Sequence, residues 1–419
     1  MHEHPVRLVV EDDYRRNRLT VFFRLLLAIP HYVWFFLWSI LIFFTAIANW
    51  AISLFTGRPP AGLHRLMCGY VRYQAHLTAY LSLAANPYPG FVGEEGEYPV
   101  DVTLPEEPSA QPRWTILIRI VLAIPALVVS AALAGSGGLN VATTRSGSRN
   151  TRGVNGGGAL LFACGFLGWF ACLARGRMPK GLRDAAVYAI GYTAQSTAYV
   201  LMVTDRYPNA DPTEMLAAVV DRPPRHPVRV VGDPYDLRRS RLTVFFRLPL
   251  AIPHLVWLLL WSIAAFVAAL AQWVLTLFSG TPGEGLHRFL ARYVRYELHV
   301  QAFLYLVGNP FPGFAGTEHT YPLDLEVPGP QRQNRWKTGF RIVLWLPALL
   351  VSSALGGALS ASAVLTWFYA LVRGSAPWGL RNLAAYALRY NAQTYAYLFL
   401  LTESYPHASP LEGEDTPAE

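Results

Sequence analysis

Apolar and polar positions follow one order four times along the chain. Each copy opens with a short run in which apolar and polar residues alternate, as in VDVTL at 100–104. A period of two is typical of a half-buried strand, although an extended linker can show it too. A long apolar stretch comes next, and a less apolar helix then begins at a Gly-Leu pair. We therefore expect many helices and four short strands, which could pair in one small sheet at one membrane face.

Two pairs of copies are closely similar. PVRLVV, RLTVFFRLLLAIPH and NPYPGF in the first half return as PVRVVG, RLTVFFRLPLAIPH and NPFPGF in the second half. Weaker copies follow each of them, with LIRIVLAIPA in one and GFRIVLWLPA in the other. This periodicity defines four repeats, in which A resembles C and B resembles D. The repeats are 1–92 (A), 97–213 (B), 226–315 (C) and 320–410 (D), followed by an acidic tail, 411–419, that we expect to be disordered.

The spacing of prolines and glycines indicates an insert in repeat B. A proline and a glycine enclose the long apolar stretch 27 residues apart in repeats A, C and D, but 51 apart in B, which therefore carries 24 extra residues, 135–158. Their Gly-, Ser- and Arg-rich composition does not fit a lipid-facing helix. We predict that each long apolar stretch is a helical hairpin that turns at the matching point, between Ser39 and Ile40 in repeat A. One long bent helix per repeat is the alternative.

The helix after each Gly-Leu pair carries a narrow polar stripe. At about 100° per residue, Arg65, Arg72 and His76 of repeat A lie within roughly 40° of arc, and repeat C has the same residues at matching positions. An arginine at the centre of a bilayer costs about 2.5 to 3.5 kcal/mol. We therefore expect an amphipathic helix that lies in the membrane interface or packs its stripe on another protein surface.

The composition indicates a membrane protein. Hydrophobic residues make up 53% of the 419 positions and charged residues only 15%, against about 25% in an ordinary soluble domain. A net charge of +8 on so few charged residues favours anionic membrane lipids over nucleic acid as partners. The positive-inside rule favours eight crossings of the cell inner (plasma) membrane, with all hairpin bases on the cytoplasmic side. The predicted fold class is an all-α polytopic membrane protein of four tandem repeats.

An arginine recurs six residues before the proline of each long apolar stretch. At the start of an apolar helix it is either a snorkelling anchor or a phosphate-binding site, since its five donors match phosphate geometry. The stripe arginines of repeats A and C are further headgroup candidates. The prolines lack an N–H donor, which predicts kinks. The candidates are Arg24, Arg119, Arg247, Arg341, Arg72 and Arg295 for lipid headgroups, and Pro30, Pro125, Pro253 and Pro347 for the kinks.

The sequence contains no motif that predicts catalysis. HExxH, GxSxG, a phosphate-binding loop and a dinucleotide fingerprint are all missing. His31 and His254 follow the prolines, and His76 and His299 lie on the polar stripes, but none has a carboxylate at ligand spacing. We therefore predict no catalytic residue, no metal and no cofactor, and expect the protein not to be an enzyme.

The combination of YPV[RD]L, an arginine six residues before an AIPH or LPA turn, FTGRPPAGL and a closing YP is similar to the DUF4389 family, a domain of unknown function found in bacterial, notably actinobacterial, membrane proteins. The resemblance covers almost the whole chain and is weakest in repeat B, where Ala126 follows the proline in place of histidine. It implies membrane residence and supplies no catalytic residues. We expect a protein that interacts with lipid or scaffolds another membrane protein. A transporter or lipid flippase is the alternative, and it would need polar groups near the bilayer centre.

Overall fold

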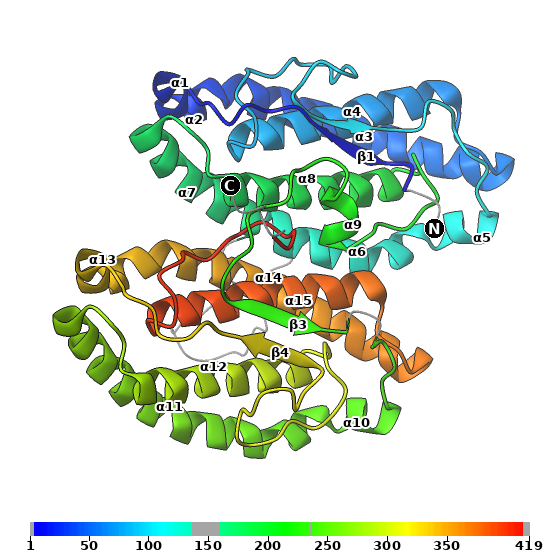
Figure 1. Cartoon of the computed structure of the whole chain (residues 1–419). Helices are drawn as coiled ribbons and strands as arrows, with labels where there is room; N and C mark the ends of the chain where they lie inside the picture. Colours follow the sequence, from blue (N-terminus) through cyan, green and yellow to red (C-terminus); the bar gives the residue numbers. More distant parts are fainter. Residues whose placement is uncertain (1–3, 136–158, 234–235, 414–419) are drawn as a thin grey trace, which may run out of the picture. The chain divides into compact units, whose positions relative to one another are not determined.

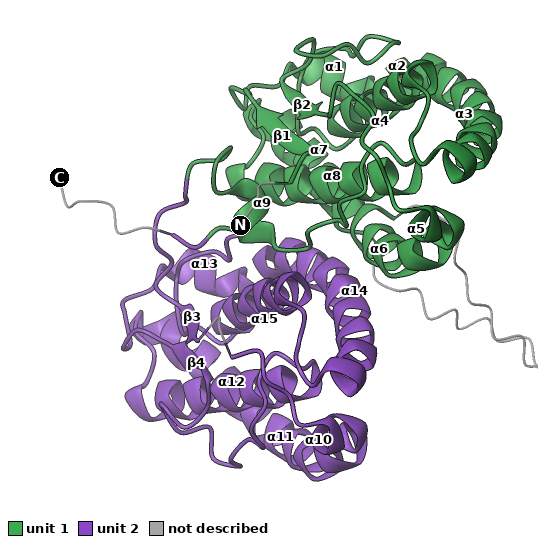
Figure 2. Ribbon diagram, turned by 90° about the vertical axis from the view of Figure 1, so that its right-hand side faces the viewer, with its two compact units in different colours: residues 1–221, 409–411 green, residues 222–408, 412–419 purple. Residues whose placement is uncertain are grey.

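The computed structural model describes residues 4–135, 159–233 and 236–413. The chain divides into two compact units, which Figure 2 shows in different colours. Unit 1 comprises residues 1–221 and 409–411, and unit 2 comprises residues 222–408 and 412–419. Each unit therefore joins two neighbouring repeats, A with B and C with D. The chain is mostly helical with only short strands, as predicted.

Unit 1 contains the elements of repeats A and B in the same order. Repeat A contributes β1 (Arg7–Val10), α1 (Arg18–Phe22), α2 (Arg24–Leu27), α3 (Ile29–Thr56) and α4 (Ala61–Leu81). Repeat B contributes β2 (Val100–Thr103), α5 (Arg113–Leu117), α6 (Arg119–Ala134), α7 (Leu160–Arg175), α8 (Lys180–Val200) and α9 (Pro212–Leu216). Figure 1 shows α4 and α8 side by side, with β1 in front of them.

Unit 2 follows the same plan, with its two long apolar helices uninterrupted. Repeat C contributes β3 (Arg229–Gly232), α10 (Arg241–Phe245), α11 (Arg247–Ser279) and α12 (Glu284–Leu304). Repeat D contributes β4 (Leu323–Glu326), α13 (Arg335–Gly339), α14 (Arg341–Arg373) and α15 (Trp378–Leu398). We call α4, α8, α12 and α15 the central helices.

The alternating runs form strands, as predicted, but these pair two by two. β1 pairs with β2 and β3 pairs with β4, both antiparallel. Val100 and Val102 on β2 are at most 1% exposed. The expectation of one four-stranded sheet was wrong for the residues that the structure describes. The reason is that β2, β3 and β4 pack on the central helices of their own unit, so each strand finds its partner within that unit.

The predicted hairpins are wrong for repeats A, C and D. α3, α11 and α14 run without a break through the expected turns. With α2 included, the three long apolar helices each cover 33 residues and are long and apolar enough to cross a membrane. The single bent helix is correct because an uninterrupted apolar run offers no groups to satisfy the backbone of a turn. Figure 2 shows α3 and α14 as curved helices. The count of eight crossings, which depended on the hairpins, loses its basis.

In repeat B the insert interrupts the corresponding helix. α6 ends at Ala134 and α7 begins at Leu160, and a Cβ placed on Gly135 would lie 2.5 Å from the Cβ of Ala159. Gly135 has a φ of +71°, the left-handed conformation that commonly ends a helix. The two helix ends therefore abut, and α6 with α7 packs on α8 as α14 packs on α15. The rest of the insert, 136–158, and the tail after Gly413 lie outside the described residues.

A helix break accompanies the proline only in repeat A. Ala28 separates α2 from α3, and Pro30 lies in the first turn of α3, where its missing N–H costs little. In the other repeats the helix continues through the proline, at Pro125, Pro253 and Pro347.

The central helices form the middle of each unit. α4 packs against α8 and α12 against α15, while the strands cover one face of each pair. In α8 every residue from Arg183 to Tyr192 is buried. Of the two expected settings for these helices, packing of the polar stripe on protein is the one that the structure shows. Arg72 and Arg295 contact the strands and loops of their own unit, whereas Arg65 and Arg288, at the start of the stripe, are exposed.

Candidate functional site

Arg24 closes the C-terminal end of the central helix α4. Its guanidinium donates hydrogen bonds to the carbonyl oxygens of Tyr80 at 2.6 Å, Ala85 at 3.2 Å and Asn86 at 3.2 Å. The guanidinium carbon also lies 4.2 Å from the centroid of the Tyr80 ring. A cation at this end satisfies free carbonyl groups and is favoured by the helix dipole.

Arg247 has the same role at the end of α12. It donates to the carbonyl oxygens of Phe303 at 2.5 Å and Gly308 at 3.3 Å, and it lies 4.4 Å from the centre of the Phe303 ring. The repeated arginine therefore joins the start of a long helix to the end of the following central helix.

In repeats B and D the arginine binds a glutamine, and the glutamine in turn binds a carbonyl group at the end of the central helix. Arg119 bonds to Oε1 of Gln111, and the amide of Gln111 donates to the carbonyl oxygen of Met202 at 2.9 Å. The ring of Tyr199 lies under the guanidinium, 4.3 Å away. The matching residues of unit 2 are Arg341, Gln333, Leu400 and Tyr397.

Each central helix is followed by a left-handed residue that is not glycine. These four residues have φ between 60° and 64° and are Leu83, Met202, Leu306 and Leu400. Such a conformation costs a residue with a Cβ about 1 to 2 kcal/mol. The arginines and glutamines bind the carbonyl groups around this bend. They therefore stabilise a backbone conformation that the residue alone does not favour, which explains why the arginine recurs in every repeat.

The structure places these four arginines inside the protein. Each is at most 2% exposed. Their hydrogen bonds go to main-chain carbonyls and glutamine side chains of their own unit, so the geometry does not support the expectation of a snorkelling anchor or a phosphate site at Arg24, Arg119, Arg247 and Arg341.

Arg72, the stripe arginine of repeat A, belongs to a buried charged cluster on β2. His76 Nε2 lies 2.7 Å from Oδ1 of Asp101, and Arg72 Nε lies 3.7 Å from the same oxygen. Arg72 also pairs with Glu95 at 2.8 Å, and the Gly96 N–H donates to Asp101 Oδ2 at 2.7 Å. These contacts fix α4 to β2, and Arg72, at 8% exposure, is not placed for a lipid headgroup.

Repeat C contains the same cluster. Asp324 lies 3.1 Å from His299 and 3.2 Å from Arg295, which also pairs with Glu318 at 2.9 Å. Burial alone would raise the pKa of Asp324, but hydrogen bonds from His299 and from the backbone, together with the charge of Arg295, lower this pKa to about 2. The carboxylate therefore stays ionised and holds α12 on β4. Arg295, only 4% exposed, is likewise committed to protein contacts.

A histidine beside a carboxylate can act as a general base, but this pair is closed to solvent. His76 is 0% exposed, and its Nδ1 has no hydrogen-bond partner among the described residues. Cys68 lies 3.6 Å from His64 on the same helix, yet burial raises the pKa of its thiol to about 11, which makes it unreactive. In the described ranges no three His, Cys, Asp or Glu side chains are grouped so that they could hold a metal ion. The cluster is structural.

The pairing of His76 with Asp101 was not predicted. Both repeats that contain the histidine place an aspartate 25 residues later, in YPVD and YPLD. That repeated spacing is the signal that could have revealed the pair. It was missed because the contact joins a helix to a strand, and spacing within one helix does not show it.

The histidine after the proline is held by the NPYPGF loop. His31 Nδ1 lies 2.8 Å from the Tyr73 hydroxyl, and its ring stacks on Phe91 with centroids 4.3 Å apart. Repeat C has the same contacts, made by His254, Tyr296 and Phe314. Both imidazoles are 0% exposed. The AIPH and NPYPGF motifs are therefore explained by packing between the long helix and this loop.

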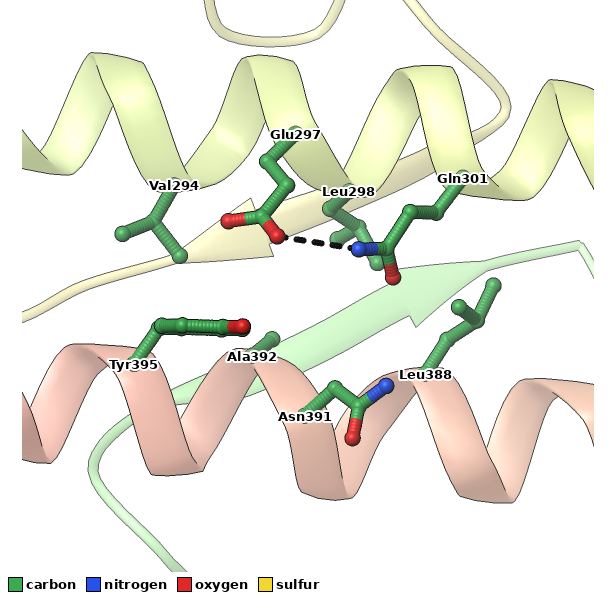
Figure 3. Close-up of a pocket in the computed structure, with 8 residues that line it drawn as sticks. All are labelled: Val294, Glu297, Leu298, Gln301, Leu388, Asn391, Ala392 and Tyr395. Atoms are coloured by element: carbon green, nitrogen blue, oxygen red, sulfur yellow. Dashed lines mark hydrogen bonds between the residues drawn. The ribbon is translucent and has the colours of Figure 1, made fainter. Parts of the chain in front are cut away.

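A polar row lies on α12 and α15 opposite the charged cluster. Figure 3 shows Glu297 and Gln301 of α12 facing Asn391 and Tyr395 of α15. Glu297 is two residues from Arg295, about 200° around the helix, so it points away from β4. Gln301 Nε2 donates to Glu297 Oε1 at 2.9 Å. Surrounding protein raises the pKa of Glu297 to about 7.

The polar row has a neutral counterpart in unit 1. The matching positions in α4 and α8 are Gln74, Thr78, Thr193 and Thr197. In both units a serine of the neighbouring helix donates to the row, from Ser130 to Thr193 at 3.3 Å and from Ser352 to Asn391. We did not predict this row. Its signal is a pair of polar residues four apart on each central helix.

One family model, described as a domain of unknown function (DUF4389), matches the chain four times. The matched residues are 18–93, 155–210, 241–315 and 335–409, which together make up more than half of the chain. Four matches are consistent with the four repeats. No curated protein and no solved structure matches the chain.

Proposed function

Since the chain belongs to the DUF4389 family, a domain of unknown function, we propose that it is a non-enzymatic protein of the cell inner (plasma) membrane that interacts with lipid. The observation that carries this proposal is the exposed apolar surface of the long helices. In α11 only 11% of the most apolar 18-residue segment is buried. Leu248, Leu259 and Phe266 of this helix are each more than 60% exposed. Soluble monomers rarely expose contiguous apolar patches larger than a few hundred Å². Lipid chains are the surroundings that match such a helix.

The length of the long helices supports the same proposal. At 1.5 Å per residue, 33 residues extend about 50 Å, which exceeds the hydrocarbon thickness of about 30 Å. Each helix can therefore cross the hydrocarbon and continue into the headgroup layer. Arg18, Arg58 and Arg373 are exposed near the ends of these helices, where they are available to anionic lipids. A second membrane protein could also bind the apolar faces, which is the scaffolding form of the proposal.

A transporter or lipid flippase is the second candidate. The observation that favours it is the polar row, because it places polar side chains beside long apolar helices. Transport through a membrane requires such groups within the apolar region. The buried arginines do not distinguish the two candidates, because each is enclosed by its own unit and is at most 2% exposed.

Depth-dependent fluorescence quenching tests the membrane location. Single cysteines replace Phe266, in the middle of α11, and Gln331, in the polar loop before α13, in a background without Cys68, Cys164 and Cys172. Each is labelled with bimane, and the full chain is reconstituted with lipids brominated on their acyl chains. We expect strong quenching at position 266 and little at 331. Equal quenching, or release of the protein from membranes by alkaline carbonate, would contradict the proposal.

A further inference from the structure

The polar row of unit 2 holds a carboxylate without a cation. Glu297 accepts a hydrogen bond from Gln301, and within the described part of the chain no basic side chain pairs with it. The titratable groups beside it are the phenols of Tyr293 and Tyr395. Glu297 is half-buried, and a carboxylate largely removed from water is normally paired with a positive group. The missing counter-ion indicates a ligand.

The pocket beside Glu297 is narrow and partly open to its surroundings. It is lined by the polar row, and its interior has room for about one water-sized group, about 10 Å³. A primary ammonium group has this size, whereas a trimethylammonium group is larger. Its three N–H donors match the oxygens present, namely the Glu297 carboxylate and the side-chain carbonyl of Gln301. The aromatic ring of Tyr395 lines the same cavity and suits a cation.

The surroundings of the row are apolar. α11 packs on α12 and α14 packs on α15, so the two long helices flank the row. Leu304 and Leu398 continue it about one turn beyond Gln301 and Tyr395. Ser352 donates to the side-chain oxygen of Asn391, which leaves the amide N–H groups of Asn391 as donors for an anionic oxygen. The row therefore offers a site for a cation, an amide donor and apolar sides. An amphiphile with an ammonium head group carries its cation, its anionic oxygen and its alkyl chains in the same order.

We propose that the polar row between α12 and α15 binds the primary ammonium group of an ethanolamine phospholipid, with the Glu297 carboxylate as counter-ion. The proposal rests on the membrane location proposed above and names the lipid class. Unit 1 lacks the site, because Gln74 occupies the position of Glu297 and carries no charge.

Native mass spectrometry of the full chain in detergent tests the proposal. The probes are phosphatidylethanolamine and phosphatidylcholine with identical acyl chains, added to the wild type, Glu297→Gln and Glu284→Gln. Glu284 is the matched control, since it lies on the same helix, is exposed and pairs with Arg288 on the surface. We expect the wild type and Glu284→Gln to prefer phosphatidylethanolamine at least ten-fold. Glu297→Gln should lose roughly ten-fold to a hundred-fold in that affinity and keep its affinity for phosphatidylcholine.

Two measurements on the wild type keep the test decisive if Glu297→Gln does not fold. Phosphatidylethanolamine binding should weaken between pH 8 and pH 6, because a carboxyl group with a pKa of about 7 loses its charge in that range. Ethylamine should compete with the lipid, since it carries the same ammonium group. Equal binding of the two lipids, or unchanged binding by a folded Glu297→Gln, would overturn the proposal. Binding of ethylamine without lipid selectivity would mean that the site takes free amines, which overturns its assignment to a lipid.

Failure of this proposal can be told apart from failure of the proposed function. A protein that resists carbonate extraction and is quenched by brominated lipid, but shows no preference for phosphatidylethanolamine, refutes the ammonium site alone. A protein that is extracted by carbonate refutes the membrane location itself.

Discussion

Replacing Arg247 by glutamine should destabilise unit 2 rather than remove a bound lipid. Arg247 is 2% exposed and donates to the carbonyl oxygens of Phe303 and Gly308. A hydrogen bond to a charged group contributes about 1.5 to 3 kcal/mol, so the loss of two lowers the free energy of unfolding by roughly 3 to 6 kcal/mol. The left-handed Leu306 between these carbonyls would also lose the contacts that hold it.

The assay is thermal unfolding of the purified full chain in detergent, followed by tryptophan fluorescence. A domain of this size loses about 2 to 4 °C per kcal/mol, so the midpoint for unit 2 should fall by roughly 6 to 24 °C. Arg288→Gln is the control, because its exposed pair with Glu284 contributes at most about 1 kcal/mol. An unchanged midpoint for Arg247→Gln, together with loss of co-purified anionic lipid, would refute this reasoning and restore the headgroup site.

Three further predictions follow from the buried groups and the insert. The pKa of Asp324 is about 2, below its ordinary value of 3.8, so its contribution to stability should be complete above about pH 5 and lost as the pH falls towards 2. In acid unfolding, Asp324→Asn should therefore lose less stability than the wild type over that range. The Cys68 thiol, with a pKa of about 11, should resist maleimide at pH 7 until the protein unfolds, and rapid labelling of the native protein would contradict its burial. Deleting 136–158 should join α6 to α7 and keep the unfolding midpoint within a few degrees, since the ends abut; loss of folded protein would show that the ends cannot be joined directly.

Several elements could be predicted because their signals are local. The alternating residues of β2 and β4 and the apolar runs of α11 and α14 each lie within one continuous segment, where period and composition are sufficient. The recurrence of Arg24 and its three equivalents was also visible, because alignment of the four repeats brings equivalent positions together. Their partners were not visible, since Tyr80 lies 56 residues from Arg24 and accepts the hydrogen bond through its main-chain carbonyl, with its ring beside the guanidinium. Every residue has a main-chain carbonyl group, so the sequence does not show which of them a side chain contacts.

The sequence by itself determined the four repeats, the helical character, the strands and the long apolar segments. Only the tertiary structure decided that the apolar segments are continuous, that the strands pair within each unit, and that the arginines close the ends of central helices. It also decided that Glu297 faces Asn391 and Tyr395 across two helices. The physical reason is the range of the contacts. Period and composition report which face of a segment is buried, whereas the identity of the group packed against that face depends on segments far away in the chain.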